Sequence, residues 1–356
     1  CQFARRSQWT WHMHAHYRSW TTALRLIALA VILILAPARG WAEPVVLKLS
    51  FFTSDRSTVY ECHVKPFVDA VNADGAGIIQ IHVYFSGAIS ASQPEQPKLV
   101  LSGAADMALI VPGRTPEDFP DSFVFALPGL FRNDEEASLA FTRLVEDNAL
   151  QGYSRFFVVG AHVSVAENIH SRKPIATISD LKGQRLRVNN EVEADVLKRL
   201  GAVPVVLPLN RAMDSLSEGT IDGVVVDPSV LAEFGFSRLA QNHYLLGLGA
   251  APLALVMNRE KFTSVPPHAQ EIIRKYSGDW SAKQKAACSG AKAREVIAQL
   301  RAAPRRAVID PSPADLATAR AAYDAAIQAW TAASPHNREL IDKVTAALAR
   351  PRKNGN

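Results

Sequence analysis

The segment Asp180–Val188 reads DLKGQRLRV and places one arginine, Arg187, in a short strand-like run after a Lys-Gly turn. A guanidinium held on a strand edge is a good receptor for a carboxylate, because its planar fork matches the two oxygens. The pattern therefore favours recognition of an organic anion. The alternative is an ordinary surface arginine, since Arg185 lies on the same face two residues earlier.

Motifs for catalysis or metal binding are missing from the sequence after residue 42. It contains no Ser nucleophile elbow, no phosphate-cradling glycine loop and no carboxylate pair at motif spacing. CxxC, HExxH and close His pairs are also absent, and His162 and His170 are poorly spaced as metal ligands. We expect a non-enzymatic protein without cofactor or metal.

The first 42 residues have the features of a secretory signal. They contain five arginines, no Asp or Glu, and an apolar run, Leu26–Ala36, before the small residues around Ala42. We predict that the chain starts at Met13, is cleaved after Ala42 and is released into the periplasm. The alternative is an uncleaved anchor, although the run is shorter than the roughly 20 residues that cross a bilayer.

Removal of this segment changes the charge of the protein. Without its five arginines, the 39 basic residues become 34, which equals the number of Asp and Glu residues. The basic isoelectric point therefore says nothing about nucleic acid, and no basic tract with interleaved aromatic residues follows residue 42. We expect no nucleic-acid partner.

Two cysteines follow the leader, Cys62 and Cys288. They could pair in an oxidising compartment, but their separation in sequence does not predict a disulfide. Cys62 lies in a helical pattern, so we interpret it as a small buried hydrophobic residue.

The chain first alternates strand and helix patterns, which is typical of α/β folds with covered sheets. Strands are expected at Val45–Phe52, Ile78–Phe85, Ala105–Val111 and Phe156–Ala161, and helices at Ser57–Asn72, Glu95–Ser102 and Asp134–Asp147.

A second alternating unit follows, and then a helical C-terminal part. Strands are expected at Arg185–Val188, Val203–Leu207, Ile221–Val226, Tyr244–Leu248 and Leu253–Met257. Helices are expected at Glu191–Leu200, Arg211–Glu218, Pro267–Ala303 and Pro313–Arg350.

Three segments in order resemble the periplasmic solute-binding proteins of tripartite ATP-independent periplasmic (TRAP) transporters, the dicarboxylate-binding-like DctP family. They are Phe85–Pro120 with GAADMALIVPG, Ile169–Val188 with SDLKGQRLRV, and Gly201–Asn258 with LSEGTIDGVVVDP and LVMN. The combination of LKGxxxRV, LGAxPV, LxxGxxDG and MNxxKF is specific, whereas each motif alone is weak.

The resemblance implies a two-lobed α/β periplasmic binding protein fold with hinge strands, a cleft between the lobes and long C-terminal helices. We expect lobe I at residues 43–165 and 252–290, and lobe II at residues 166–251 and 291–356. The implied function is capture of a small organic acid and its delivery to the membrane permease subunits. An alternative is a receptor of the same fold that presents its ligand to a sensor protein.

The same resemblance assigns Arg187 the salt bridge to the ligand carboxylate. Asp227, Pro228 and Ser229 occupy a place where relatives supply an amide or aromatic contact, and neither type is present here. Asp227 could repel a second carboxylate, accept from a ligand hydroxyl or amine, or serve only as a helix N-terminal acid.

Each further candidate for ligand contact also has an ordinary structural interpretation. Arg114 would add a second cation if it faces the cleft, but loop arginines are usually solvated. Glu167 lies where some relatives place a cleft arginine, which disfavours a ligand of the sialic-acid type. Phe52 and Thr53 end the first strand and could line the crevice, or Phe52 could pack in the core. His170 could donate to the ligand or be a structural histidine.

Overall fold

The structure is a computed structural model that describes residues 43–350, and residues 44–350 belong to one compact unit. The expected leader and its cleavage site after Ala42 lie outside the described residues. None of the helices in the described part is long and apolar enough to cross a membrane.

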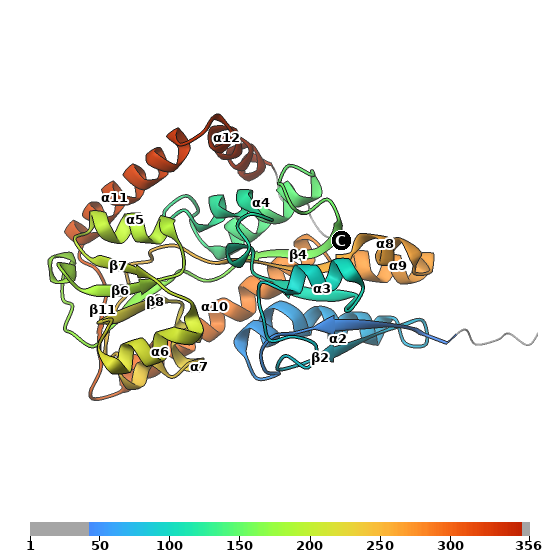
Figure 1. Cartoon of the computed structure of the whole chain (residues 1–356), viewed down its shortest axis with the longest axis horizontal. Coiled ribbons are helices and arrows are strands. Elements are labelled where there is room, and N and C mark those ends of the chain that lie inside the picture. The colour runs from blue at the N-terminus through green and yellow to red at the C-terminus, as the bar shows by residue number, and fades with distance from the viewer. Residues whose placement is uncertain (1–42, 351–356) are drawn as a thin grey trace, which may run out of the picture. The chain divides into compact units, whose positions relative to one another are not determined.

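The first of two mixed sheets has the strand order β2-β1-β3-β10-β4 (Figure 1). These strands are β1 (Val45–Ser50), β2 (Ile79–Tyr84), β3 (Met107–Ile110), β4 (Phe156–Val163) and β10 (Pro252–Asn258). Strand β1 pairs in parallel with β2 and β3, whereas β10 is antiparallel to β3 and β4. The chain therefore returns to this sheet late, after it has built the second one.

The second sheet has the order β11-β9-β5-β8-β6-β7. Its strands are β5 (Asn168–Ser171), β6 (Arg185–Val188), β7 (Val203–Val206), β8 (Gly223–Val226), β9 (Asn242–Tyr244) and β11 (Ala307–Ile309). Strand β6 is parallel to β7 and β8, and β5 is antiparallel to β8 and β9. The two sheets are the centres of two lobes, as expected for the fold class.

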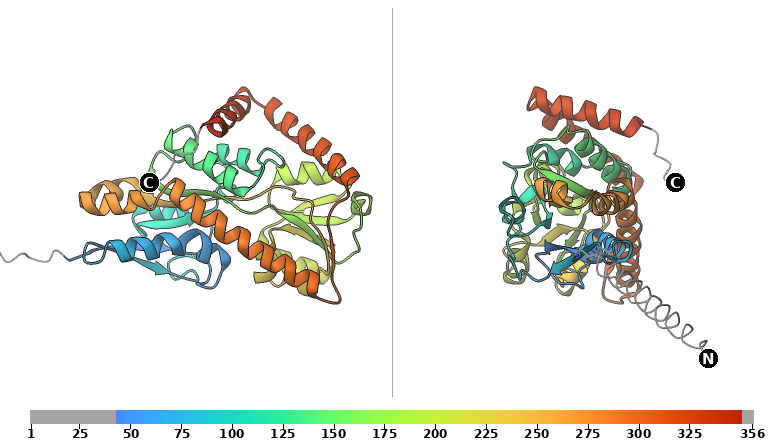
Figure 2. Two further views of the ribbon diagram at one scale, coloured as in Figure 1. Left: turned by 180° about the vertical axis from the view of Figure 1, so that it is seen from behind. Right: turned by 90° about the vertical axis from the view of Figure 1, so that its right-hand side faces the viewer.

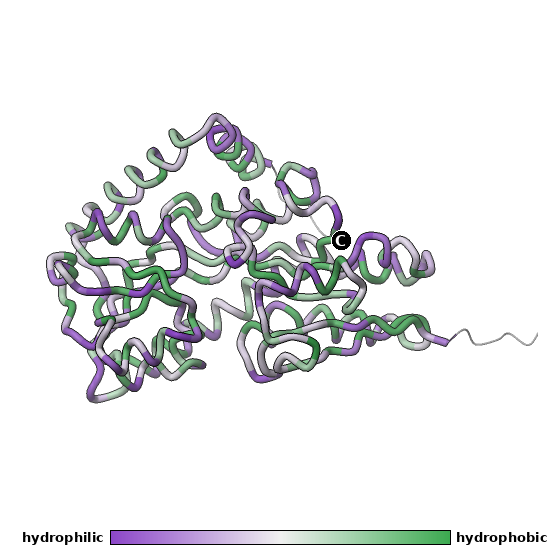
Figure 3. Tube along the Cα trace, viewed as in Figure 1, coloured by the Kyte–Doolittle hydropathy of each residue, from purple (hydrophilic) through white to green (hydrophobic). Residues whose placement is uncertain are grey.

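Helices cover both sheets, and the strands between them form the apolar interior (Figure 3). The helices around the first sheet are η1 (Tyr60–Val64), α2 (Lys65–Asp74), α3 (Gln96–Ser102), η2 (Pro112–Arg114), η3 (Pro120–Ala126), α4 (Asp134–Glu146), α8 (Arg259–Ser264) and α9 (Pro267–Lys275). Those of the second part are η4 (Ile178–Leu181), α5 (Glu191–Arg199), α6 (Leu209–Glu218), α7 (Pro228–Glu233) and η5 (Phe236–Arg238), and the C-terminal ones are α10 (Asp279–Ala302), α11 (Pro313–Ala332) and α12 (Pro335–Ala349).

Two chain segments connect the lobes side by side. One joins β4 to β5, the other joins β9 to β10, and they exchange backbone hydrogen bonds. The Glu167 amide donates to the Gly249 carbonyl at 2.9 Å, and the Leu248 amide donates to the Glu167 carbonyl at 2.8 Å. Glu167 is therefore held at the junction of the lobes. Helix α10 crosses behind both lobes, packing on α4 and β4 in one and on α7 in the other (Figure 2).

The C-terminal part has shorter helices than the sequence predicts. The expected helix Pro267–Ala303 is broken before α10, where Gly278 adopts a positive φ of 64°. The expected helix Pro313–Arg350 is broken before Pro335, where Ser334 caps α12. Helical periodicity continues through such breaks, because both halves keep one buried face.

Other boundaries also differ. The expected helix Ser57–Asn72 is observed as the π-helical turn η1 followed by α2, and the expected strand Tyr244–Leu248 ends at Tyr244. The expectation of parallel sheets is wrong in part, since β5, a short strand that the sequence did not reveal, and β10 run antiparallel. The short elements β11, α7 and α8 were likewise not predicted, because a segment of so few residues is too short to show a clear hydrophobic period.

Cys62 and Cys288 form a disulfide, with their Cα atoms 5.4 Å apart. Cys62 is buried as expected, but the interpretation as a free hydrophobic residue is wrong. The fold brings η1 against α10 across a sequence separation of 226 residues. That proximity is tertiary and has no local signal in the sequence.

Candidate ligand-binding site

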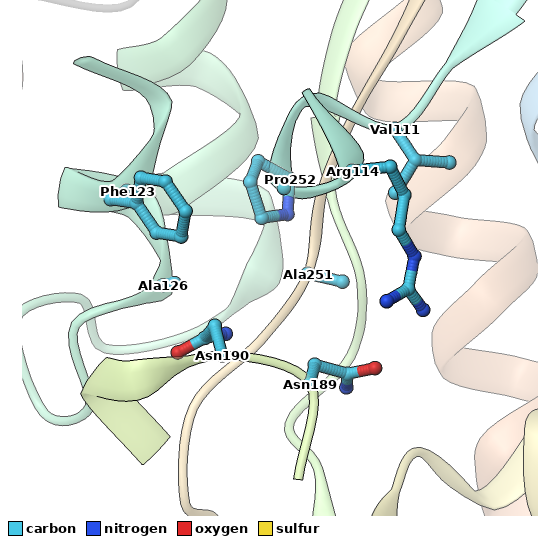
Figure 4. Close-up of a pocket in the computed structure, with 9 residues that line it drawn as sticks. Val111, Arg114, Phe123, Ala126, Asn189, Asn190, Ala251 and Pro252 are labelled. Atoms are coloured by element: carbon cyan, nitrogen blue, oxygen red, sulfur yellow. The ribbon is translucent and has the colours of Figure 1, made fainter. Parts of the chain in front are cut away.

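A small cavity lies between the lobes (Figure 4). The first lobe contributes residues after β3 and from η2 and η3, and the second contributes the residues that follow β6. The lining residues are Val111, Gly113, Arg114, Phe123, Ala126, Asn189, Asn190, Ala251 and Pro252. The volume of about 30 Å³ is room for one or two water molecules. A larger ligand would therefore need the lobes to separate.

Arg187 lies in β6 and is completely buried; it is not itself among the lining residues but contacts one of them, Asn189. Its Nε donates to the Leu207 carbonyl at 2.7 Å and its Nη2 donates to Asn189 Oδ1 at 2.7 Å. Its Nη1 has no hydrogen-bond partner among the described residues. A buried guanidinium is therefore fixed in direction and keeps one nitrogen for another acceptor.

Arg114 ends η2 in the other lobe and is half-buried. Its Nε donates to Gln93 Oε1 at 3.2 Å, and its guanidinium extends toward Asn189 in Figure 4. Burial lowers the pKa of Arg114, while Glu167 and Glu193 raise it. Arg114 is therefore part of the cleft and not a solvated loop residue.

Glu167 is the first acidic group of the site and is 3% exposed. Both of its carboxylate oxygens accept from Asn189 Nδ2 at 2.9 Å. Burial, Glu193 and Asp227 hold the pKa of Glu167 well above its usual range, while Arg187 and Asn189 act in the opposite direction. Asn189 thus connects Arg187 to Glu167 and also lines the cavity.

Glu193 is the second acidic group and is also fully buried. It accepts from the backbone amide of Asn189 at 2.8 Å and from Asn190 Nδ2 at 2.8 Å. Asn190 in turn caps α5, because its Oδ1 accepts from the backbone amide of Glu193. Burial raises the pKa of Glu193 to about 7. Burial also lowers the pKa of Arg187 to about 10, although the nearby charge of Glu167 acts to raise it.

The predicted trio Asp227, Pro228 and Ser229 forms the start of α7 and does not line this cavity, whereas Pro228 lines a second, more open cavity of about 440 Å³. Asp227 caps this helix by accepting from the Ser229 amide at 2.8 Å and the Val230 amide at 3.2 Å. Burial raises the pKa of Asp227 to about 6. Its capping role is established, and a ligand role for the trio stays a prediction.

Phe52, Thr53 and His170 also lie outside the described lining of this cavity. Phe52 stacks on Phe51 with ring centroids 5.4 Å apart, and the Thr53 carbonyl accepts from the Ser86 amide. His170 is buried in β5 and pairs with His243, the two Nδ1 atoms being 2.9 Å apart. Burial lowers the pKa of His170 to about 3, so it is a neutral imidazole in the sheet.

The sequence analysis missed four residues of the site: Asn189, Asn190, Glu193 and Phe123. Asn189 and Asn190 directly follow the strand that carries Arg187, and strand ends line ligand crevices in α/β sheets. That position was a usable signal. Phe123 comes from a 3-10 helix of the other lobe, and only the tertiary structure brings it to Asn190.

The family model for bacterial extracellular solute-binding protein, family 7 (DctP), matches residues 49–333. The chain belongs to this family. Members of the DctP family are binding proteins without enzymatic activity, and their location is periplasmic. The described residues contain no group of three or more His, Cys, Asp or Glu that could hold a metal ion.

Solved structures of similar proteins agree with this membership. A marine metagenome TRAP solute-binding protein specific for aromatic acids, in complex with 3-hydroxybenzoate, is 25% identical with a TM-score of 0.80. The match covers 88% of this chain and all of that one. A TRAP solute-binding protein from Rhodoferax ferrireducens with copurified benzoate is 26% identical, TM-score 0.76, over 86% of this chain and 98% of that one.

A solute-binding protein from Sulfitobacter sp. is 23% identical over 257 residues, which are 71% of this chain and 77% of the relative. The family and the fold of this DctP protein are therefore shown by sequence and by structure together.

Proposed function

We propose that this DctP protein captures a small organic acid between its lobes and delivers it to the membrane permease of a TRAP transporter. The observation that carries the proposal is the buried guanidinium of Arg187, whose Nη2 donates to Asn189 of the cavity lining and whose Nη1 has no partner among the described residues. A carboxylate oxygen is a good partner for that nitrogen, because charge-assisted hydrogen bonds are strong in a buried site.

The cavity lining favours an aromatic monocarboxylate. Phe123 and Ala126 lie on one side of the cavity, whereas Arg114 and Asn189 lie on the other (Figure 4). An acid with a flat apolar body would place its carboxylate at the arginines and its ring against Phe123. The two relatives with 3-hydroxybenzoate and benzoate support this class.

Hinge motion would supply the space for such a ligand. The cavity of about 30 Å³ is far smaller than the several hundred Å³ that are typical of ligand pockets. The connecting segments at Glu167 and Gly249 are the natural hinge, since they run between the two sheets and are joined by backbone hydrogen bonds. The lobe boundaries expected near residues 165 and 251 fall in these segments.

The test is isothermal titration calorimetry of the wild type and of Arg187→Met with benzoate, 3-hydroxybenzoate and gulonate. We expect micromolar or tighter binding of the aromatic acids and a loss of at least about 100-fold in Arg187→Met. Arg199→Met is the matched control, because Arg199 is a partly exposed helix residue paired with Asp195. Unchanged affinity in Arg187→Met would reject the site.

A further inference from the structure

Glu167 is surrounded by charged groups from several elements. Arg187 comes from β6, Arg114 from η2, Glu193 from α5 and Asp227 from the start of α7. Lys285 of α10 also interacts with Asp227, but it is hydrogen-bonded to Asp134 at 2.8 Å. With Lys285 paired to Asp134, the carboxylates of Glu167, Glu193 and Asp227 already outnumber the two guanidiniums of the site.

A bound carboxylate changes this balance. The unpartnered Arg187 Nη1 points to an additional acceptor, so the ligand joins Glu167 and does not replace it. Among the described hydrogen bonds, Arg187 and Glu167 are connected through the side-chain amide of Asn189. Two guanidiniums would then face four carboxylates in a buried site, where an unbalanced charge is costly.

Glu167 is better suited than Glu193 to lose its charge. Glu193 accepts from two separate donors, the backbone amide of Asn189 and Asn190 Nδ2, and both stabilise a carboxylate. Glu167 shares the single Nδ2 group of Asn189 between its two oxygens. Fewer donors give less stabilisation of the ionised form, so the proton goes to Glu167.

We propose that Glu167 takes up one proton when a monocarboxylate binds beside Arg187, so that ligand capture is coupled to proton uptake. This rests on the proposed function, because the ligand must bring the additional carboxylate. The atoms balance simply: a solvent proton adds to one carboxylate oxygen of Glu167, and the protein–ligand complex gains one positive charge. The protonation of Glu167 thereby determines how much negative charge the site accepts from a ligand.

The direction of the pH dependence follows. Burial and the neighbouring acids Glu193 and Asp227 already raise the pKa of Glu167 in the free protein, and a bound carboxylate raises it further. Affinity is constant below the pKa of the free site. It falls by up to about tenfold per pH unit between the free and bound pKa values, because one proton is linked to binding.

The experiment is calorimetric titration of the full protein with benzoate from about pH 5 to about pH 9, in two buffers of different ionisation enthalpy. The difference in heat between the buffers counts the protons taken up. For the wild type we expect uptake approaching one proton within the sensitive pH window. Glu167→Gln is expected to bind benzoate with a nearly constant Kd, because the amide mimics the protonated carboxyl. Glu191→Gln, on the exposed first turn of α5, is the matched control and should keep the wild-type uptake.

Two results would overturn the inference while leaving the proposed function intact. One is benzoate binding with a flat pH profile and no proton uptake in the wild type. The other is uptake that persists in Glu167→Gln but is lost in Glu193→Gln, which would place the proton on Glu193. Absence of benzoate binding at every pH would instead reject the aromatic-acid function, and the coupling with it.

Discussion

The guanidinium of Arg187 and the carboxylate of Glu167 are joined by one side chain, the amide of Asn189. Asn189 accepts from Arg187 Nη2 at 2.7 Å and donates to both Glu167 oxygens at 2.9 Å. The arginine comes from a strand of one lobe, whereas the glutamate lies on a connection between lobes. The orientation of the Arg187 guanidinium is therefore tied to the connection between the lobes.

Removal of this amide is expected to weaken ligand binding. In Asn189→Ala, Arg187 Nη2 loses its acceptor and Glu167 loses the only side-chain donor among its described hydrogen bonds. We expect a decrease in benzoate affinity of about tenfold, since a hydrogen bond to a charged group contributes about 1.5–3 kcal/mol. Calorimetry measures it, with Asn210→Ala on the exposed part of α6 as control. Equal affinities of the two variants would show that the bridge does not orient the receptor.

Phe123 is expected to determine the preference for aromatic acids. Phe123→Ala removes the ring from the cavity wall, so benzoate should lose about tenfold in affinity, while acetate binding should change by less than about twofold. Competition measurements with both acids test the difference. A parallel loss for benzoate and acetate would mean that Phe123 shapes the whole site and not the ring contact.

Lys285 is expected to stabilise the fold at a distance from the ligand. It is completely buried in α10, donates to Asp134 Oδ2 at 2.8 Å and also donates to the Val163 carbonyl. Lys285→Met leaves both acceptors without this donor, and we expect a loss of about 3 kcal/mol in the free energy of unfolding. Chemical denaturation measures it. Lys283→Met, at an exposed position of the same helix, should remain within about 0.5 kcal/mol of the wild type.

Buried histidines are expected to make the protein sensitive to acid. Burial lowers the pKa of His170 and His162 to about 3 and that of His243 to about 4. An unfolded chain binds these protons near pH 6.5, so stability falls as the pH decreases from about 6.5 towards the folded-state pKa values. Each fully buried imidazole costs about 3 kcal/mol by pH 4.

The measurement is the free energy of unfolding between pH 7 and pH 4 for the wild type and for His170→Leu/His243→Leu. The double variant should lose less stability than the wild type on acidification, whatever its stability at pH 7. His82→Leu, at an exposed position of β2, is the control and should follow the wild-type slope. If the double variant lost stability with pH as steeply as the wild type, His170 and His243 would not be the source of the acid sensitivity.

Local patterns predicted much of the architecture. Alternating strand and helix periods gave the elements of both lobes, because their buried faces repeat with periods that are visible in the residues themselves. The LKGxxxRV motif likewise drew attention to Arg187, and the position of Asn189 at the end of the same strand was available in the same way. Short elements such as β5, β11 and α7 were missed, since three to six residues carry too little period to stand out.

The sequence by itself therefore determined the class of the protein and the residue that most resembles an anion receptor. Only the tertiary structure decided which charges face that receptor. Glu167, Glu193 and Arg114 are far apart in the chain or in different lobes, and burial together is what shifts their pKa values. The pairing of Cys62 with Cys288 was decided in the same way. Contacts between segments distant in sequence follow from how the helices and sheets pack, which no local residue pattern records.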